Sequence, residues 1–174
     1  FSTQRAHRTH RHMKHKWLWI IRHGYAANSL DIPDFERPLT QQGQEQALVA
    51  GRGIRSITGA PEFVLTSSAP RATATAKLLA GKSHAVVEEQ EHLYMASVDT
   101  LLAATWSIPS DIRSAIVVGH NPGVSHLANL LAGQTEYRLP PLGAVCFEVT
   151  TPWEDLGSSP LRVSRFVEPS ANLP

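Results

Sequence analysis

Short apolar runs alternate along the chain with longer and more polar stretches. Three of these runs, over residues 17–21, 62–66 and 115–118, are rich in bulky and β-branched side chains, and glycine or serine follows each of them closely. Apolar runs of this length, bounded by turn residues, predict strands that are buried on both faces of a sheet. Weaker runs predict three further strands, over residues 85–87, 144–149 and 161–167.

The stretches between the apolar runs carry helix signals. Thr40 is a good N-cap for a helix over residues 41–57, and Pro70 suits the first turn of a helix that Gly81 ends. Further helices are expected over residues 98–106 and 122–133, the second of them with Asn121 as its N-cap. Because strands alternate with helices, the pattern predicts an α/β fold. We expect a three-layer α/β/α sandwich around a mostly parallel sheet, with the two late strands mixed in direction.

The composition indicates a soluble domain with a sizeable core. Hydrophobic residues make up 42% of the 174 residues, and no apolar run approaches the roughly 20 residues that cross a membrane. The one cysteine, Cys146, excludes an intramolecular disulfide and a multi-cysteine metal site, and it suits a reducing compartment. We therefore expect a cytoplasmic protein that does not bind membranes.

The first sixteen residues differ in charge from the rest of the chain. They contain five basic residues, four histidines and no acidic residue, which leaves 11 basic against 15 acidic residues elsewhere, a net charge of −4. Nothing therefore predicts a nucleic-acid partner. We expect residues 1–15 to be a flexible, basic extension, in which Met13 marks an alternative natural start, and residues 16–174 to be one domain. A solvated tail is favoured over opportunistic metal binding by His7, His10 and His12.

Side chains that suit phosphate follow three predicted strands at the point where each strand ends. They are Arg22, His23 and Gly24 after the first, Arg71 after the second, and His120 after the run at residues 115–118. Because the carboxyl ends of parallel strands meet at one edge of a sheet, we expect these residues to lie together, next to the starts of helices. Arg37 precedes another helix and can reach the same edge.

These residue types suit phosphate chemistry when they lie together. Arginine offers a planar and permanently charged donor fork for phosphate oxygens, and histidine can act as a nucleophile near neutral pH. Gly24 would let an anion approach the backbone closely. Taken singly, a residue such as His120 or Arg71 is more often structural or exposed on the surface. Several such residues at the same edge of one sheet favour a phosphate site.

The same segments resemble a known family. Arg22-His23-Gly24, the segment at residues 67–76 and Val118-Gly119-His120-Asn121-Pro122 are similar to motifs of the histidine phosphatase (phosphoglycerate mutase-like) superfamily. Tyr25-Ala26-Ala27 and Arg37-Pro38-Leu39-Thr40 resemble its SixA-like phosphohistidine phosphatase branch. The resemblance extends over about residues 17–167.

The resemblance implies a phosphoglycerate mutase-like fold and a covalent phosphoryl transfer without a metal or cofactor. His23 would attack phosphorus and form a phosphohistidine enzyme, which water then hydrolyses. Phosphate would be bound by Arg22, Arg37, Arg71, His120, Asn121 and Gly24. The arginines should keep His23 neutral, whereas His120 would serve better as a charged donor once phosphate is bound.

A general acid is harder to assign. The acidic run offers Glu88, Glu89 and Glu91, of which Glu91 is the favoured candidate, although solvated surface carboxylates are the stronger interpretation of all three. Phosphohistidine releases imidazole, a weaker base than an alkoxide, so it needs less help from an acid. Protein phosphohistidine is therefore the expected substrate. The alternatives are a small-molecule phosphomonoesterase of the same superfamily and a non-catalytic module that binds phosphate or phosphoproteins.

Overall fold

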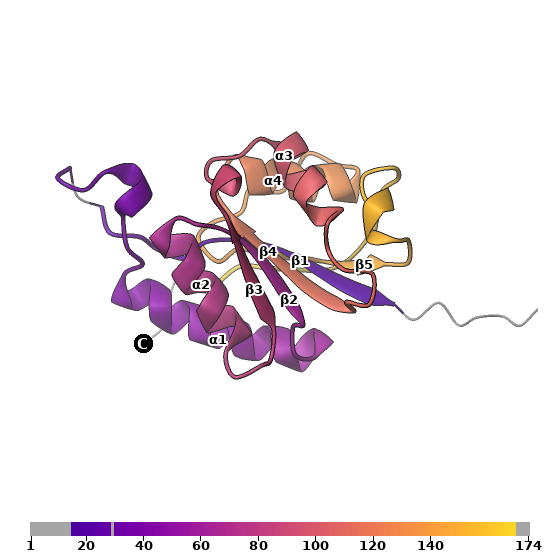
Figure 1. Cartoon of the computed structure of the whole chain (residues 1–174), viewed down its shortest axis with the longest axis horizontal. Coiled ribbons are helices and arrows are strands. Elements are labelled where there is room, and N and C mark those ends of the chain that lie inside the picture. The colour runs from indigo at the N-terminus through magenta and orange to yellow at the C-terminus, as the bar shows by residue number, and fades with distance from the viewer. Residues whose placement is uncertain (1–14, 29, 170–174) are drawn as a thin grey trace, which may run out of the picture.

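The structure is a computed structural model that describes residues 15–28 and 30–169. Within them, six strands and four helices follow one another along the chain (Figure 1). The strands are β1 (Lys16–Arg22), β2 (Phe63–Ser67), β3 (Val86–Gln90), β4 (Ser114–Gly119), β5 (Ala144–Val149) and β6 (Arg162–Val167). The helices are α1 (Gln41–Thr58), α2 (Pro70–Ala80), α3 (Val98–Thr105) and α4 (Gly123–Ala132). The expected extension lies outside the described residues up to residue 14, and this includes His7, His10 and His12.

The strands form one mixed sheet in the order β3-β2-β4-β1-β5-β6. β1 to β4 run parallel to one another, whereas β5 pairs antiparallel with β1, and β6 pairs antiparallel with β5. The expected sheet, mostly parallel with late strands of mixed direction, is confirmed. Every residue of β2 and β4 is buried, while the edge strands β3 and β6 carry exposed charged side chains that oppose pairing with another chain.

Helices cover both faces of the sheet, with α1 and α2 on one side and α3 and α4 on the other (Figure 1). Side chains of β1 alternate between the two layers because successive residues of a strand face opposite ways. Leu18 and Ile20 join the core under α3 and α4, whereas Trp19 and Ile21 join the core under α1 and α2. This arrangement confirms the three-layer sandwich. None of the helices described here is both long and apolar enough to span a lipid bilayer.

Local signals set most helix ends where the sequence predicts them. The Thr40 hydroxyl accepts a hydrogen bond from the amide of Gly43 at 3.0 Å and so caps α1, and Pro70 is the first residue of α2. The cap expected at Asn121 is wrong. The helix α4 begins at Gly123 without a side-chain cap, because the amide group of Asn121 has other partners.

The edge strand β3 is longer than the three residues expected for it. It extends to Gln90, so Glu88 and Glu89 lie on an exposed strand at the side of the sheet. The Glu89 carboxylate is 3.7 Å from the ammonium group of Lys77 on α2. These two carboxylates are surface groups, and Glu91 alone of the three acidic candidates follows the strand.

Candidate active site

The carboxyl ends of β1, β2 and β4 meet at one edge of the sheet, as expected. Arg22 pairs with Gly119 in the parallel register of β1 and β4, which places the next residues, His23 and His120, side by side. The centroids of their rings are 5.0 Å apart. Arg71, in the first turn of α2, reaches both rings with its guanidinium group. Residues 22, 23, 71 and 120, which the sequence predicts to converge, therefore form one cluster.

Arg71 is the centre of this cluster, and only 1% of its side-chain surface is exposed. Its Nε donates to His23 Nε2 at 3.2 Å, and its Nη1 donates to the main-chain oxygen of Asp34 at 2.6 Å. Its Nη2 lies 3.4 Å from His120 Nδ1 and 3.1 Å from Asp34 Oδ2. Because every nitrogen has a partner, the guanidinium plane is held in one orientation, as recognition of a phosphate requires.

His23 presents an unprotonated nitrogen to Arg71. Its Nδ1 lies 2.7 Å from the carbonyl oxygen of Gly24, which can only accept, so we assign the ring proton to Nδ1. The Nε2 lone pair then accepts from Arg71. The pKa of His23 is lowered to about 4 overall. Burial is the main cause, Arg71 and Arg22 add to it, and the hydrogen bond to Gly24 opposes it. His23 is therefore neutral at pH 7, as expected for a nucleophile.

His120 holds the opposite tautomer. Its Nδ1 faces a guanidinium nitrogen of Arg71, which can only donate, so Nδ1 carries the lone pair and the Nε2–H donates to the hydroxyl of Ser67 at 2.7 Å. Burial first, and then the neighbouring His23 and Arg71, together lower the pKa of His120 to about 3. His120 is thus neutral in the phosphate-free site. The charged form of His120 in a phosphate complex stays a prediction. Ser67, the hydrogen-bond partner of His120, was not identified from the sequence.

The two other arginines, Arg22 and Arg37, lie at the same edge and are less buried than Arg71. Arg22 is partly buried; its Nη1 donates to the carbonyl oxygen of Leu139 at 3.3 Å, and its buried Nε has no hydrogen-bond partner among the described residues. Arg37 contacts Asp34 Oδ1 through Nε and Nη2 at 3.0 Å each, and its Nη1 donates to the carbonyl oxygen of Ala27 at 3.3 Å. A buried cationic donor without an acceptor is costly, so Arg22 favours an anionic ligand.

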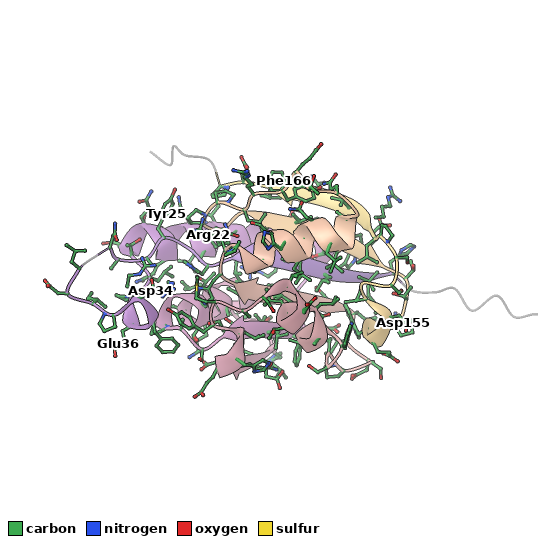
Figure 2. The ribbon with its side chains drawn as sticks, turned by 90° about the horizontal axis from the view of Figure 1, so that it is seen from above. Arg22, Tyr25, Asp34, Glu36, Asp155 and Phe166 are labelled. Atoms are coloured by element: carbon green, nitrogen blue, oxygen red, sulfur yellow. The ribbon has the colours of Figure 1, made fainter. Side chains whose placement is uncertain are left out.

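Asp34 is the carboxylate of the site, and sequence reasoning missed it. In Figure 2, Asp34 lies well away from Asp155, and Arg22 lies between the two, on the side of Asp34. The carboxylate of Asp34 accepts hydrogen bonds from Tyr94, Arg71 and Arg37. The pKa of Asp34 is lowered to about 2, chiefly by the hydrogen bond from the Tyr94 hydroxyl; desolvation, the second-largest effect, opposes this shift, and Arg71 and Arg37 add to it. An ionised carboxylate therefore occupies donors of both Arg71 and Arg37.

Three other predicted residues have different surroundings. The amide of Asn121 donates to the carbonyl oxygen of Leu139 at 2.8 Å and accepts from the Ser125 hydroxyl at 2.6 Å, so its polar groups are engaged within the protein. The Gly24 amide donates to Thr75 Oγ1 at 3.0 Å. The carboxylate of Glu91 is exposed and makes no hydrogen bond or ion pair with the cluster, so the structure does not bring it to the arginines.

The two buried histidines predict a dependence of stability on pH. Their pKa values are about 4 and about 3 in the folded protein against 6.5 for an ordinary histidine, so between pH 6.5 and 4 the unfolded chain binds more protons than the folded one. We expect the free energy of unfolding to fall by on the order of 3 kcal/mol for each histidine as the pH decreases through this window. Urea unfolding of the wild type and of His120→Asn at a series of pH values measures it. Equal pH slopes for the two proteins would contradict the prediction.

Comparisons with known proteins agree with this geometry. The chain is 30% identical over 134 residues to an uncharacterized protein of Mycobacterium leprae, covering 72% of this chain and 82% of the relative. It is also 30% identical over 146 residues to an uncharacterized protein of Mycobacterium tuberculosis, covering 78% and 91%. Residues 18–97, which contain His23, Asp34 and Arg71, match the family profile of the histidine phosphatase superfamily (branch 1). The chain belongs to the histidine phosphatase superfamily.

Solved structures with the same fold include SixA proteins. A proposed phosphohistidine phosphatase, SixA, of Nakamurella multipartitia superposes with a TM-score of 0.80 at 24% identity, covering 90% of this chain and 98% of that one. The protein histidine phosphatase SixA in complex with tungstate gives a TM-score of 0.74 at 22% identity and covers 88% and 97%. A phosphoserine phosphatase of Entamoeba histolytica, at 15% identity and 88% and 98% coverage, gives 0.60. These likenesses show the fold, and it is membership of the histidine phosphatase superfamily that identifies the chain as a phosphatase, a hydrolase of phosphorylated compounds.

Proposed function

We propose that this phosphatase removes the phosphoryl group from protein phosphohistidine through a covalent intermediate on His23. The single observation that carries the proposal is the state of this residue. Its Nδ1–H is held by Gly24, and its Nε2 lone pair lies 3.2 Å from Nε of a buried arginine, Arg71. A neutral imidazole nitrogen next to a fixed cation is suited to attack a phosphoryl group whose negative charge that cation stabilises.

The reaction would proceed in two displacements. First, Arg71 Nε–H leaves His23 Nε2 for a phosphoryl oxygen, and the freed lone pair of Nε2 forms a bond to phosphorus while the bond from phosphorus to the substrate imidazole breaks. That imidazole keeps the electron pair and takes a proton from solvent. The positive charge that His23 gains is stabilised at its Nδ1–H by the Gly24 carbonyl. A water molecule then attacks phosphorus, the bond to Nε2 breaks, and inorganic phosphate leaves with His23 neutral again.

The arginines would supply the positive charge that this chemistry needs. Phosphoryl transfer depends on positioning and electrostatic stabilisation more than on other covalent help. Arg71 and Arg37 already hold a carboxylate, and the Nε of Arg22 lacks a partner within the described part of the chain. A phosphoryl group that takes the place of the Asp34 carboxylate would satisfy these donors, so we propose a mechanism that needs no metal ion or cofactor.

The choice of phosphohistidine rests on the leaving group. Asp34, whose carboxyl group binds Arg71, is ionised at neutral pH because its pKa is about 2, and Glu91 does not contact the cluster. A site that lacks a protonated acid at neutral pH suits imidazole, which leaves more readily than an alkoxide. The SixA structures, one of them a protein histidine phosphatase with a bound tungstate, support the same choice. A cysteine nucleophile is not supported, since Cys146 is buried in β5 and burial raises its pKa to about 12.

A comparison of substrates tests this proposal. We expect kcat/KM on a phosphohistidine-bearing protein to exceed that on phosphoserine, sugar phosphates and nucleotides by roughly 100-fold or more, which corresponds to about 3 kcal/mol of transition-state stabilisation. Each substrate is assayed at pH 7 by release of inorganic phosphate. A preference for any alkyl phosphate would overturn the choice of phosphohistidine. No hydrolysis of any substrate, together with phosphate binding, would point to the non-catalytic module.

A small-molecule phosphomonoesterase is the second candidate, and Asp34 is the observation that favours it. A dianionic phosphate that binds Arg71 and Arg37 would displace the carboxylate, release it from the charges that lower its pKa, and let it donate a proton to an alkoxide. The side chain of Asp34 is 54% exposed and sits on a loop, so it has room to move.

Replacement of Asp34 distinguishes the two candidates. We expect Asp34→Asn to bind inorganic phosphate about tenfold more tightly, measured as competitive inhibition, because the arginines lose a competing anion. For a phosphohistidine phosphatase, kcat on phosphohistidine should stay within about threefold of the wild type. For a phosphomonoesterase, kcat on its alkyl phosphate should fall by roughly 100-fold, the contribution of one general acid.

A further inference from the structure

Two aromatic side chains stand at the edge of the cluster, and their rings have no role in the mechanism above. Phe35 lies in the 3-10 turn Asp34–Glu36, and Tyr94 follows the 3-10 turn Glu91–Leu93. Their ring centroids are 4.9 Å apart and the rings are nearly perpendicular, at 83°. The side chains thus form one aromatic pair, which joins two loops that are far apart in the sequence.

The aromatic pair contacts the residues that would bind phosphate. The Tyr94 ring centroid is 5.3 Å from that of His120 and 5.8 Å from the guanidinium carbon of Arg71. The Phe35 carbonyl lies 3.5 Å from Nη1 of Arg71, which also binds the carbonyl of the preceding residue at 2.6 Å. The position of Phe35 is therefore tied to the arginine at the centre of the site.

Packing of the core does not account for these rings. Neither Phe35 nor Tyr94 belongs to either of the two core clusters, and Phe35 is 38% exposed. An exposed apolar ring next to a charged cluster gains stability when a ligand covers it. Pairs of aromatic rings prefer edge-to-face or offset arrangements, so a third planar ring can join this pair.

The contacts of Tyr94 would bring the aromatic pair close to a bound phosphoryl group. A phosphoryl group bound between Arg71 and His120 would have the Tyr94 ring beside it, and the Phe35 ring packs against that ring. In an in-line displacement the leaving group departs opposite the attacking atom, His23 Nε2, so it would point out of the cluster, where exposed side chains such as Phe35 can reach it.

We infer that Phe35, supported by Tyr94, binds the planar ring of the leaving group and makes this phosphatase selective for phosphoryl groups carried on rings. The inference rests on the proposed function and adds to it a residue that determines specificity. Phe35 has no side-chain hydrogen-bonding group, so its contribution is contact with the ring face. The substrate class is therefore phosphorylated planar rings, of which the imidazole of phosphohistidine is the member with a phosphorus–nitrogen bond.

Two substrates with the same scissile bond test this inference. A phosphohistidine peptide and phosphoramidate both contain a phosphorus–nitrogen bond, but phosphoramidate releases ammonia and has no ring. We expect Phe35→Leu, which keeps apolar volume without a ring, to lower kcat/KM on the peptide by roughly three- to tenfold and to leave kcat/KM on phosphoramidate unchanged. Phe35→Ala should show the same selectivity with a larger loss.

Phe166→Ala is the matched control. Phe166 is 42% exposed, lies on the edge strand β6 and packs against Tyr137, two strands away from β1. We expect this variant to act like the wild type on both substrates. Equal losses on both substrates in Phe35→Leu would overturn the inference, because Phe35 would then only support the turn at Asp34, and unchanged kinetics would overturn it as well. Failure of the proposed function is a separate result, since the wild type would then hydrolyse neither substrate.

Discussion

His23→Ala is expected to lose phosphatase activity by roughly 10⁴-fold or more, the scale on which covalent enzymes respond to loss of their nucleophile. The imidazole of His23 presents its Nε2 lone pair at the centre of the site, whereas the neighbouring ring of His120 has its Nδ1 facing Arg71 and its Nε2–H bound to Ser67. The same variant should form no phosphoenzyme. Acid-labile, base-stable label from a ³²P-phosphorylated substrate, trapped by rapid denaturation, measures that intermediate directly.

The control for this experiment is another histidine. His84 is exposed in the segment that leads into the amino end of β3, at the opposite edge of the sheet from the cluster, so His84→Ala should keep full activity and full labelling. His23→Asn, which retains a polar side chain, checks that the loss does not come from unfolding. Label that persists in both variants of His23 would place the nucleophile elsewhere and refute the covalent mechanism.

Much of the fold follows from local patterns in the sequence. β2 and β4 are predicted because an unbroken apolar run is stable only where both faces of a strand are covered, and every residue of these strands is buried. The start of α1 is predicted because the Thr40 hydroxyl satisfies a free amide of the first turn. The cap at Asn121 failed for a tertiary reason, since Leu139 and Ser125 compete for its amide group.

The cluster of cations could also be predicted, because parallel strands bring their carboxyl ends to one edge. His23 and His120 meet through the register of β1 with β4, and this follows from topology alone. Asp34 could not be predicted in the same way. It lies in a polar loop, where a carboxylate is normally solvated, and its partners Arg71 and Tyr94 are 37 and 60 residues away in the sequence.

The weak signal that could have identified Asp34 is its spacing from Arg37. The two residues are three positions apart and form an ion pair at 3.0 Å across a 3-10 turn. Such a pair on a surface contributes little to stability, and nothing in its sequence separates it from many others. The pair matters because a second arginine, Arg71, also binds the Asp34 carboxylate, and only folding brings Arg71 to it. The hydroxyl of Ser67 was missed for the same reason, because its partner His120 lies on another strand end.

Arg71→Lys is expected to lower kcat/KM by roughly 100- to 1,000-fold, the cost of losing one fixed donor to a charged transition state. Lysine keeps the positive charge, but one ammonium group cannot reproduce the three directions in which the Arg71 guanidinium donates, toward His23, toward the backbone of Asp34 and toward the Asp34 carboxylate. The loss should appear in kcat, because the misplaced cation no longer matches the developing charge. Steady-state kinetics on the phosphohistidine substrate measure it.

Arg37→Lys provides the comparison that separates geometry from charge. Arg37 is 24% exposed in its side chain and holds Asp34 at the outside of the site, so the same substitution should cost no more than about tenfold, mostly in KM. The two arginines share the carboxylate of Asp34 and differ in burial and in contact with His23. If both variants lost activity equally, positive charge alone would account for catalysis, and the orientation of Arg71 by its neighbours would have no catalytic role. A much larger loss in Arg71→Lys means that the buried, three-directional guanidinium stabilises the transition state, because total charge is the same in both variants.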